Sequence, residues 1–518
     1  MSALIVGRPE SCPFVRAWTL FILYIIGVGI ATIPIFTTRY PSLNDYLNHL
    51  TRAYVLARYN DDPAFARFFV PNWQPLPNLA FDVWVLVFGQ FLPIEIAGKL
   101  FIAAIFAFLV SGVIFLHRVT FHKWSLWPFL SLILLYNRPL LSGLLNFLFG
   151  VALWLHALSL WICLRKASPF IRAPALCVAS LVVFFAHLFA FAILAVTIAV
   201  YELGSFASKG ERWSRKVVDL VAGAVPFLPA LAMLAFLTPH SGASAVIRYR
   251  DFWTRLGGFA APLLYNWRVD AICFLILAVL FGWAVATKVV TFNRPLTACV
   301  IVLFLLQLAI PNVIMTAEGA DHRIPIPMML LGIAATDPNS ATRGQRLGFV
   351  LAAAAVFVFR IATVETRWSM DQRIYADASA AFALVPNGAL VATATPPDSF
   401  NDSSAAAIGL FYIPAWEVIS HGGFTQTLFA IPTQHPLVLA EKYEALAAAT
   451  PAREIWRAFV TADHNIVSSP SPALVTALRE YDYVAFLDPD KFTVRETSLF
   501  QPFYQGQYVQ IYRLYAGY

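Results

Sequence analysis

The chain has 518 residues, of which 59% are hydrophobic and only 13% are charged. Soluble domains average about 45–50% apolar and about 25% charged residues, so this composition excludes a disordered, fibrous or ordinary cytosolic protein. The apolar residues come in blocks of about 20, which is the length of a helix that crosses a bilayer. The composition therefore predicts a polytopic membrane protein.

The formal net charge of +7 is distributed unevenly along the chain. Residues 366–518 carry 9 Lys and Arg against 14 Asp and Glu, a net of −5, so residues 1–365 carry a net of +12. A basic surplus in membrane loops fixes topology, because Lys and Arg are retained on the cytoplasmic side. No basic stripe stands on a soluble fold, so no nucleic-acid partner is predicted.

The first apolar run, Ala17–Phe36, follows two arginines and is too long for a cleaved signal segment. It predicts an uncleaved span with a cytoplasmic N-terminus. A polar outer loop, 37–78, comes next, followed by the short apolar segment 79–92 between Pro77 and Pro93. That segment is either a transmembrane helix or a helix lying at the membrane interface. Only the interfacial placement puts all later basic clusters on the cytoplasmic side, so we favour it.

The remaining apolar runs predict two short, broken hairpins that turn at 137–139 and at His187, and then five further spans. Broken helices are tolerated where the freed backbone faces protein or water. The expected total is about eleven transmembrane helices within a membrane domain of residues 1–365. After Ala17–Phe36, the predicted spans are Glu95–His117, Trp124–Tyr136, Leu140–Leu164, Pro174–Ala186, Leu188–Leu203, 217–237, 269–288, 296–316, 324–335 and 347–364.

Residues 366–518 lose the membrane character and alternate short β-type and helical patterns. The odd number of spans predicts that they form a small extracytoplasmic α/β domain. The expected strands are Ala389–Ala394, Tyr483–Leu487 and Tyr508–Tyr512, and the expected helices are Pro436–Ala449 and Ser471–Glu480.

Asp45, in the outer loop, is the first candidate functional residue. If residues 44–58 are helical, His49 and Arg52 lie on the same helix face, because they follow Asp45 by four and seven residues. An acid, an imidazole and a guanidinium would then converge just above the membrane. The alternative is that Asp45 only caps the helix.

Two further candidates lie in or beside predicted spans. His187 interrupts an apolar stretch, and ionisable residues at membrane depth usually face a cavity or a partner. The alternative is a neutral histidine bonded to a nearby carbonyl. Asp321, His322 and Arg323 open a late span, where a guanidinium is placed to meet a phosphate in a bidentate contact. The alternative is that the acid and the arginine pair with one another.

Taken together, these features resemble the GT-C superfamily of polytopic glycosyltransferases, including its protein mannosyltransferase and aminoarabinose transferase group. The resembling parts are the first span, the early outer-loop acid Asp45, the proline-led segment PLPNLAFDVWVLVFGQFLPIEIAGKL from Pro75 to Leu100, and DHRIPIPMMLL from Asp321 to Leu331. Lys99 stands where the family usually has an arginine, and the second acid of the protein mannosyltransferases is missing. The acceptor class and metal dependence, including a divalent ion, therefore stay open.

The resemblance implies a GT-C-like fold in a bacterial inner membrane. It also implies an inverting transfer of a sugar from a polyprenyl-phosphate donor to a glycan, lipid or protein acceptor at the outer face. Asp45 would be the general base, ionised near its ordinary pKa of about 4. Arg323 would hold the leaving phosphate, while His49 and Arg52 would orient Asp45 or contact the donor.

Three other functions fit the same sequence features. One is a non-catalytic assembly protein whose C-terminal residues bind a partner. A lipid-linked-glycan polymerase or ligase would share the membrane chemistry but take a glycan as acceptor. A lipid or glycan transporter without catalysis would use the spans alone, although the paired halves that transporters often show are missing from the sequence. Soluble catalytic motifs such as a P-loop, HExxH or GxSxG do not occur.

Overall fold

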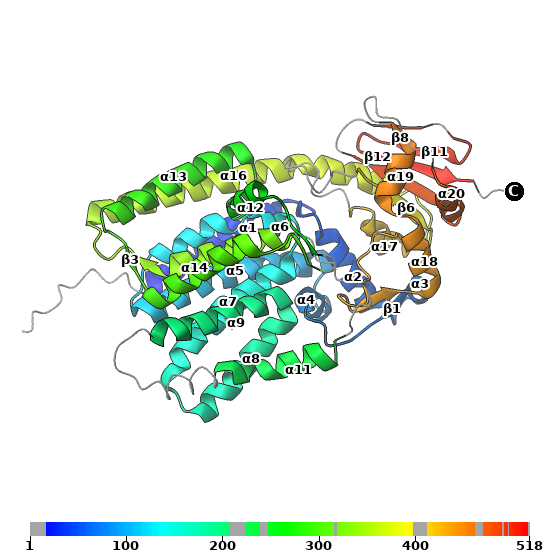
Figure 1. The fold of residues 1–518 in the computed structure, drawn as a ribbon. Coiled ribbons are helices and arrows are strands. Elements are labelled where there is room, and N and C mark those ends of the chain that lie inside the picture. The colour runs from blue at the N-terminus through cyan, green and yellow to red at the C-terminus, as the bar shows by residue number, and fades with distance from the viewer. Residues whose placement is uncertain are drawn as a thin grey trace, which may run out of the picture.

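The computed structural model describes residues 17–206, 223–238, 247–314, 319–396, 412–461, 470–488, 492–495 and 497–515. A long helical bundle is joined at one end to a smaller part that contains strands (Figure 1). The principal helices are α1 (Ala17–Thr37), α2 (Tyr46–Arg58), α3 (Pro63–Phe68), α4 (Ala80–Phe88), α5 (Ile94–Phe121), α6 (Arg138–Leu141), α7 (Leu145–Cys163), α8 (Pro169–Ala186), α9 (Leu188–Phe206), α11 (Leu228–Phe236), α12 (Phe252–Gly257), α13 (Trp267–Ala286), α14 (Arg294–Ala309), α15 (Pro325–Ala334), α16 (Arg343–Phe382), α17 (Ala415–His421), α18 (Glu441–Ala449), α19 (Ala452–Phe459) and α20 (Pro472–Leu478).

Helices that are long and apolar enough to cross a bilayer dominate the bundle, which indicates a membrane protein. Within the described chain there are five of them, α1, α5, α7, α13 and α16. Four shorter apolar helices complete the bundle: α8 and α9 pack against α7, α14 packs against α9, and α11 packs against α8. The predicted total of eleven spans stays a prediction, because these shorter helices do not by their length establish a crossing.

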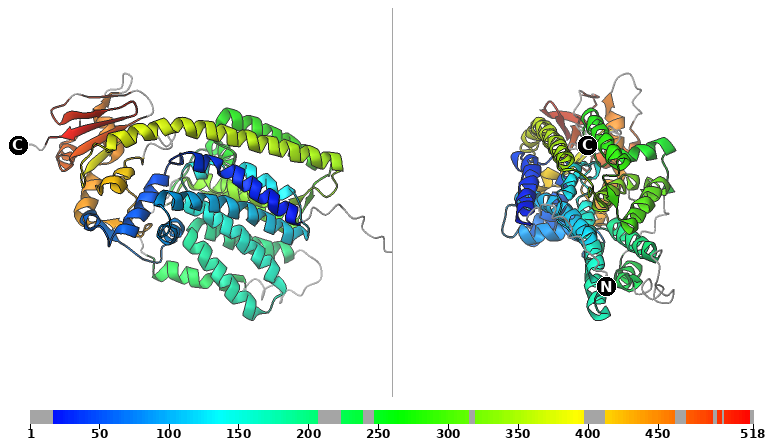
Figure 2. Two further views of the ribbon diagram at one scale, coloured as in Figure 1. Left: turned by 180° about the vertical axis from the view of Figure 1, so that it is seen from behind. Right: turned by 90° about the vertical axis from the view of Figure 1, so that its left-hand side faces the viewer.

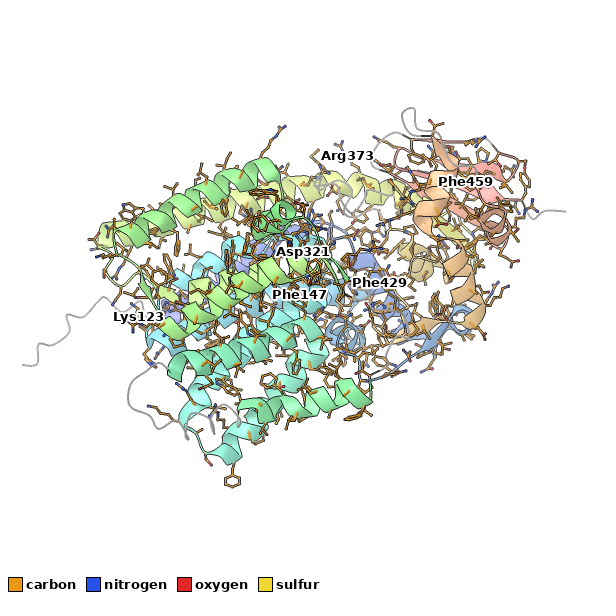
Figure 3. The ribbon with its side chains drawn as sticks, viewed as in Figure 1. Lys123, Phe147, Asp321, Arg373, Phe429 and Phe459 are labelled. Carbon is orange, nitrogen blue, oxygen red and sulfur yellow. The ribbon has the colours of Figure 1, made fainter. Side chains whose placement is uncertain are left out.

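One end of the bundle is rich in basic residues. The basic end, as we call it, is where α5 and α7 finish and α16 begins; Lys123 and Arg346 there both contact Asn339. It carries Arg118, Lys123, Arg165, Lys166, Lys288, Arg294, Arg343 and Arg346. Strands β3 (Thr291–Phe292) and β5 (Thr336–Asp337) pair at this end. Residues 209–216, which contain two lysines and two arginines, lie outside the described residues. Lys123 and Phe459 mark opposite ends of the molecule (Figure 3).

Helix α16 connects the bundle to the strand-containing part (Figure 2). Its 40 residues give a length of about 60 Å, about twice the hydrocarbon thickness of a bilayer. Beyond the end of α1 it still contacts the outer loop, where Gln372 accepts a hydrogen bond from the Arg39 amide at 3.0 Å. The predicted domain boundary at 365/366 therefore falls inside one continuous helix.

A four-stranded mixed sheet lies at the far end of α16, with strand order β11-β12-β9-β6. Its strands are β6 (Val391–Ala394), β9 (Tyr483–Leu487), β11 (Phe500–Gln505) and β12 (Val509–Leu514). Strands β6 and β9 run parallel, and the other pairs are antiparallel. The shorter strands β2 (Ile247–Arg248) and β4 (Val313–Ile314) pair with each other, as do β8 (Val460–Thr461) and β10 (Thr493–Val494).

The outer loop and the C-terminal residues share one hydrophobic core. Strand β1 (Phe69–Pro71) pairs antiparallel with β7 (Leu437–Leu439). Phe68 and Phe69 are buried against Phe424, with ring centroids 5.7 and 6.4 Å apart. The loop 37–78 is therefore part of the same folded unit as the C-terminal residues.

Most predicted elements are present, and three differ. The span predicted over Leu140–Leu164 is interrupted by a turn at 142–144, so α7 begins only at Leu145. The first residues of the span predicted over 217–237 lie outside the described residues. The helix predicted over Pro436–Ala449 begins with strand β7, and only Glu441–Ala449 is helical. Pairing with β1 overrides the local helical pattern there, as tertiary contacts commonly do. The arm predicted over Trp124–Tyr136 is a 3-10 helix, Trp127–Leu134, instead of a regular α-helix.

Candidate functional site

Asp45 is the residue immediately before α2, yet its side chain does not cap that helix. Its carboxylate accepts a hydrogen bond from Asn44 Nδ2 at 2.8 Å, and none from the amides of α2. Asp45 is partly accessible, while its neighbours Asn44 and Tyr46 are buried. The capping alternative is therefore not supported, and the carboxylate is available for another role.

A glycine turn holds the backbone at Asp45. The Asn44 amide donates to the Leu141 carbonyl at 2.9 Å. Gly143, two residues further along, has φ of +81°, and a Cβ there would lie 2.6 Å from both the Asp45 Cβ and its amide nitrogen. Only glycine accepts this dihedral without strain and leaves room for the acid. The turn between α6 and α7 thus fixes where Asp45 stands.

The environment of Asp45 changes its acidity. Burial raises the pKa of Asp45 to about 7, although Arg323, the Asn44 amide and Arg52 each oppose that rise. The expected value near 4 is therefore wrong, because desolvation of the carboxylate outweighs the nearby positive charges. A carboxyl group that titrates near neutral pH is suited to accept and return a proton.

Arg323 is the cation with the largest electrostatic effect on Asp45. Its guanidinium lies 6.0 and 5.9 Å from the ring centroids of Phe147 and Phe189. Burial lowers the pKa of Arg323 to about 10, and Asp45 opposes that shift, so the side chain stays charged at neutral pH. Cation–π contacts of this kind hold a guanidinium in an apolar setting.

His187 lies against the same aromatic residues. Its ring is 5.4 Å from Phe147, and its Nδ1 accepts the Phe189 amide at 3.0 Å. A neutral ring with Nδ1 accepting carries its proton on Nε2. His187 breaks the chain between α8 and α9 with an extended backbone, as its position in the sequence predicts.

Asp45, His187 and Arg323 thus gather at one end of the bundle from three distant stretches of sequence. No family model and no curated protein matches the chain.

A second charged group surrounds Asp321 and His322. Arg250 Nη1 lies 2.6 Å from His322 Nε2, and Arg250 Nε lies 3.7 Å from an Asp321 oxygen. Burial lowers the pKa of His322 to about 4; Asp321 opposes this shift, and Arg250 and Arg138 add to it. We call Arg138, Arg250, Asp321 and His322 the Arg250 cluster. With two guanidinium groups and a single carboxylate, it carries a net positive charge.

His49 and Arg52 are placed together as predicted, but the partner that fixes them was missed. Arg52 donates two hydrogen bonds to Asp82, both at 2.8 Å, and both side chains are 0% exposed. Arg52 Nη2 also lies 3.1 Å from His49 Nδ1. The signal for Asp82 was its charge within an otherwise apolar segment, a placement that usually implies a partner.

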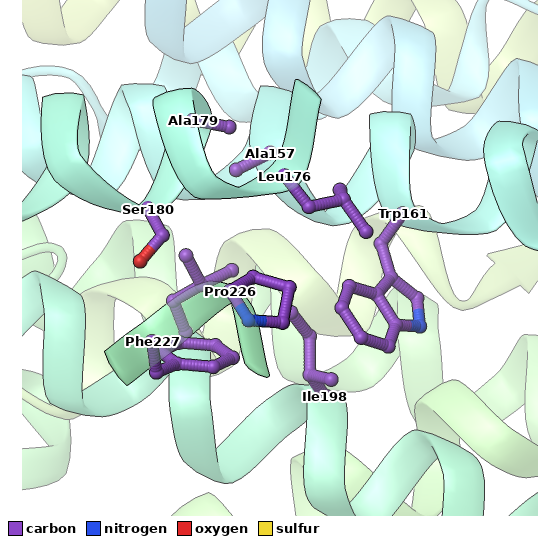
Figure 4. A pocket seen from close by; sticks show the side chains of 9 residues that line it. Ala157, Trp161, Leu176, Ala179, Ser180, Ile198, Pro226 and Phe227 are labelled. Carbon is purple, nitrogen blue, oxygen red and sulfur yellow. The ribbon is translucent and has the colours of Figure 1, made fainter. Parts of the chain in front are cut away.

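The described residues also contain a small cavity lined mainly by apolar side chains between α7, α8, α9 and the 3-10 turn Val225–Phe227 (Figure 4). Ser180 supplies its one hydroxyl group. A cavity of this composition offers no acid, base or anion-binding group. Among the described residues, no three His, Cys, Asp or Glu side chains are grouped to hold a metal ion.

Proposed function

We propose that the protein is a membrane glycosyltransferase of the GT-C type that moves a sugar from a polyprenyl-phosphate donor to an acceptor hydroxyl. The observation that carries the proposal is the Asp45 carboxylate: it does not cap its helix, burial raises its pKa to about 7, and it stands within the electrostatic reach of Arg323. An acid held in this way matches the general base that inverting sugar transfer requires.

In the proposed reaction the acceptor oxygen attacks C1 of the sugar. The new C1–O bond forms as the bond from C1 to the phosphate oxygen breaks, and its electron pair stays on the phosphate. The acceptor proton passes to Asp45, and the configuration at C1 inverts. Arg323 and Arg250 supply guanidinium groups that stabilise the negative charge that develops on the leaving phosphate.

The distribution of charge supports an outer-face site. The Arg250 cluster and Asp45 lie at the end of the bundle away from the basic end, where lysines and arginines gather. If the positive-inside rule holds, the basic end is cytoplasmic and Asp45 faces outward. With the predicted eleven spans, the same assignment gives a cytoplasmic N-terminus and extracytoplasmic C-terminal residues.

Asp45→Asn tests the role of Asp45 as base, because the amide keeps the size of the side chain and cannot accept the proton. Transfer from tritium-labelled polyprenyl-phosphate sugars into native membranes should fall at least about 100-fold. Binding of polyprenyl phosphate, followed by thermal stabilisation of the purified protein, should persist. Full transfer by a folded Asp45→Asn variant would refute the proposed mechanism.

Asp62→Asn is the matched control. Asp62 is in the same outer loop and does cap its helix, because its carboxylate accepts the Ala64 amide at 2.9 Å. Asparagine caps helices about as well as aspartate, so this variant should keep both fold and transfer. Arg250→Gln should instead weaken polyprenyl-phosphate binding by about tenfold or more, since a charge-assisted hydrogen bond contributes about 1.5–3 kcal/mol.

A further inference from the structure

The geometry points to a buried chain of contacts, Asp82–Arg52–His49–Gly143, that positions the Asp45 carboxylate. It assigns Asp82 and Gly143 as positioning residues for Asp45. This inference rests on the proposed function for its effect on turnover, whereas its structural part does not. The residues come from α4, α2 and the turn before α7, so three separate stretches of sequence converge on one acid.

The first link is an ion pair without access to water. The Asp82 carboxylate accepts hydrogen bonds from both Nε and Nη2 of Arg52, each at 2.8 Å, which fixes the plane of the guanidinium. A bidentate pair of this kind has one favoured orientation. Because neither side chain has exposed surface, the pair has no direct contact with a substrate and acts through its neighbours.

The second link fixes the histidine ring. Arg52 Nη2 is a donor only, so the His49 Nδ1 that it meets at 3.1 Å must be the acceptor, and the ring proton lies on Nε2. His49 also hydrogen-bonds the Gly143 backbone. Phe81 and Phe429 pack on the ring with centroids 5.6 and 5.3 Å away. The ring therefore has one tautomer and one position.

The third link reaches the acid by direct packing. Gly143 presents its Cα face to Asp45, with no room for a side chain between them. The Asp45 carbonyl meanwhile accepts the His49 amide at 2.9 Å. That bond belongs to the backbone of α2, so the His49 side chain acts on Asp45 through the turn at Gly143. Movement of any member of the chain shifts the carboxylate relative to Arg323.

Gly143→Ala tests the last link against a glycine of the same backbone conformation. Gly388 has φ of +72° and no atom within 4 Å of the position that a Cβ would take, so Gly388→Ala introduces the dihedral strain alone. We expect Gly143→Ala to lower kcat at least tenfold with little change in KM for the polyprenyl-phosphate sugar that the wild-type protein transfers. Gly388→Ala should keep both constants.

A readout independent of turnover separates this inference from the proposed function. The change in stability that Asp45→Asn causes is measured at pH 4 and pH 8, once in the otherwise wild-type chain and once together with Gly143→Ala. If Gly143 positions Asp45, the pH dependence of that change shrinks in the Gly143→Ala background, because the displaced carboxyl reaches solvent. The pH dependence of the Asp45→Asn effect should persist in the Gly388→Ala background. This result stands even if the chain transfers no sugar.

A second variant guards against simple unfolding. Arg52→Met with Asp82→Leu replaces the ion pair by apolar side chains, a change that is often neutral for stability. We expect folded protein with reduced kcat and the same loss of pH dependence. Asp337→Asn, which alters a buried carboxylate that pairs with His117 and Lys123 at the basic end, should leave kcat unchanged. Wild-type kcat and wild-type pH dependence in folded Gly143→Ala, or in the double variant, would overturn the inference.

Discussion

At the scale of the residue, Asp45 shows how burial and charge compete. The fold places a carboxyl group where desolvation raises its pKa to about 7 and then supplies Arg323 as an opposing charge. The folded protein therefore binds a proton between about pH 4 and pH 7 that the unfolded chain has already released. Linkage then requires this group's contribution to stability to fall as pH rises through that window.

The first prediction at this scale follows from that linkage. Asp45→Asn should match the wild type in stability near pH 4 and exceed it above pH 7, by up to a few kcal/mol. Thermal unfolding of purified protein between pH 4 and pH 8 measures the difference. A gap that is constant over this range would show that Asp45 has its ordinary acidity in the folded protein.

The second prediction concerns Arg323. Transfer should rise with pH as Asp45 loses its proton near pH 7. Of the nearby groups, Arg323 lowers the pKa of Asp45 the most. Arg323→Gln should therefore move the rise in transfer to higher pH. A pH profile of kcat measures the shift, with Arg67→Gln as control, because Arg67 contacts Tyr443 away from the site. An unmoved profile with a folded protein would separate Arg323 from Asp45.

Sequence patterns predicted the residues of this site better than their partners. The spacing of Asp45, His49 and Arg52 predicted a shared helix face, and α2 is helical over this stretch. Asp82 is 30 residues from Arg52, and Gly143 is 98 residues from Asp45, so no local period connects them. Their contacts arise only after α4 and the turn before α7 have packed on α2.

At the scale of the element, apolar run length predicted the bundle helices because membrane helices are defined by their length and composition. The pairing of β1 with β7 was not predictable in this way, since it joins residues far apart in the chain. Helix α4 was expected at the membrane interface, and its shape is compatible with that placement. It has nine residues, and beyond its buried Phe81, Asp82 and Val85 it exposes Val83 and Val87, followed by Phe91.

The prediction for α4 is that its exposed residues lie at the depth of the lipid headgroups. Phe91, which is 79% exposed, is replaced by cysteine and labelled with an environment-sensitive fluorophore in a background lacking the native cysteines. Shallow quenchers should reduce its emission more than quenchers at the bilayer centre. Phe108, exposed in the middle of α5, should give the reverse order. Labelling of the cysteine at position 91 by a membrane-impermeant thiol reagent from the cytoplasmic side only would show that 79–92 crosses the membrane.

At the scale of the whole molecule, the outer loop and the C-terminal residues act as one folded unit above the bundle. Thr51 donates to the Ala415 carbonyl at 3.0 Å, and Asn48 binds the backbone at Thr427 and Phe429 at 2.7 and 2.6 Å. These contacts connect α2, which carries the site, to segments more than 360 residues later. The C-terminal residues therefore support the helix on which Asp45 stands.

The final prediction tests this support through Phe424. Its ring is fully buried between Phe68, Phe69 and Tyr443, so Phe424→Ala should cost about 3–5 kcal/mol. Amide hydrogen exchange should accelerate in β1 as well as in β6, and transfer should decrease because α2 loses its cover. Phe486→Ala is the control, since Phe486 is equally buried but packs on Trp456, Phe500 and Tyr512 within the C-terminal residues. It should accelerate exchange in β9 and β12 and leave β1 protected. Unchanged protection of β1 in Phe424→Ala would mean that the outer loop holds its structure without the C-terminal residues.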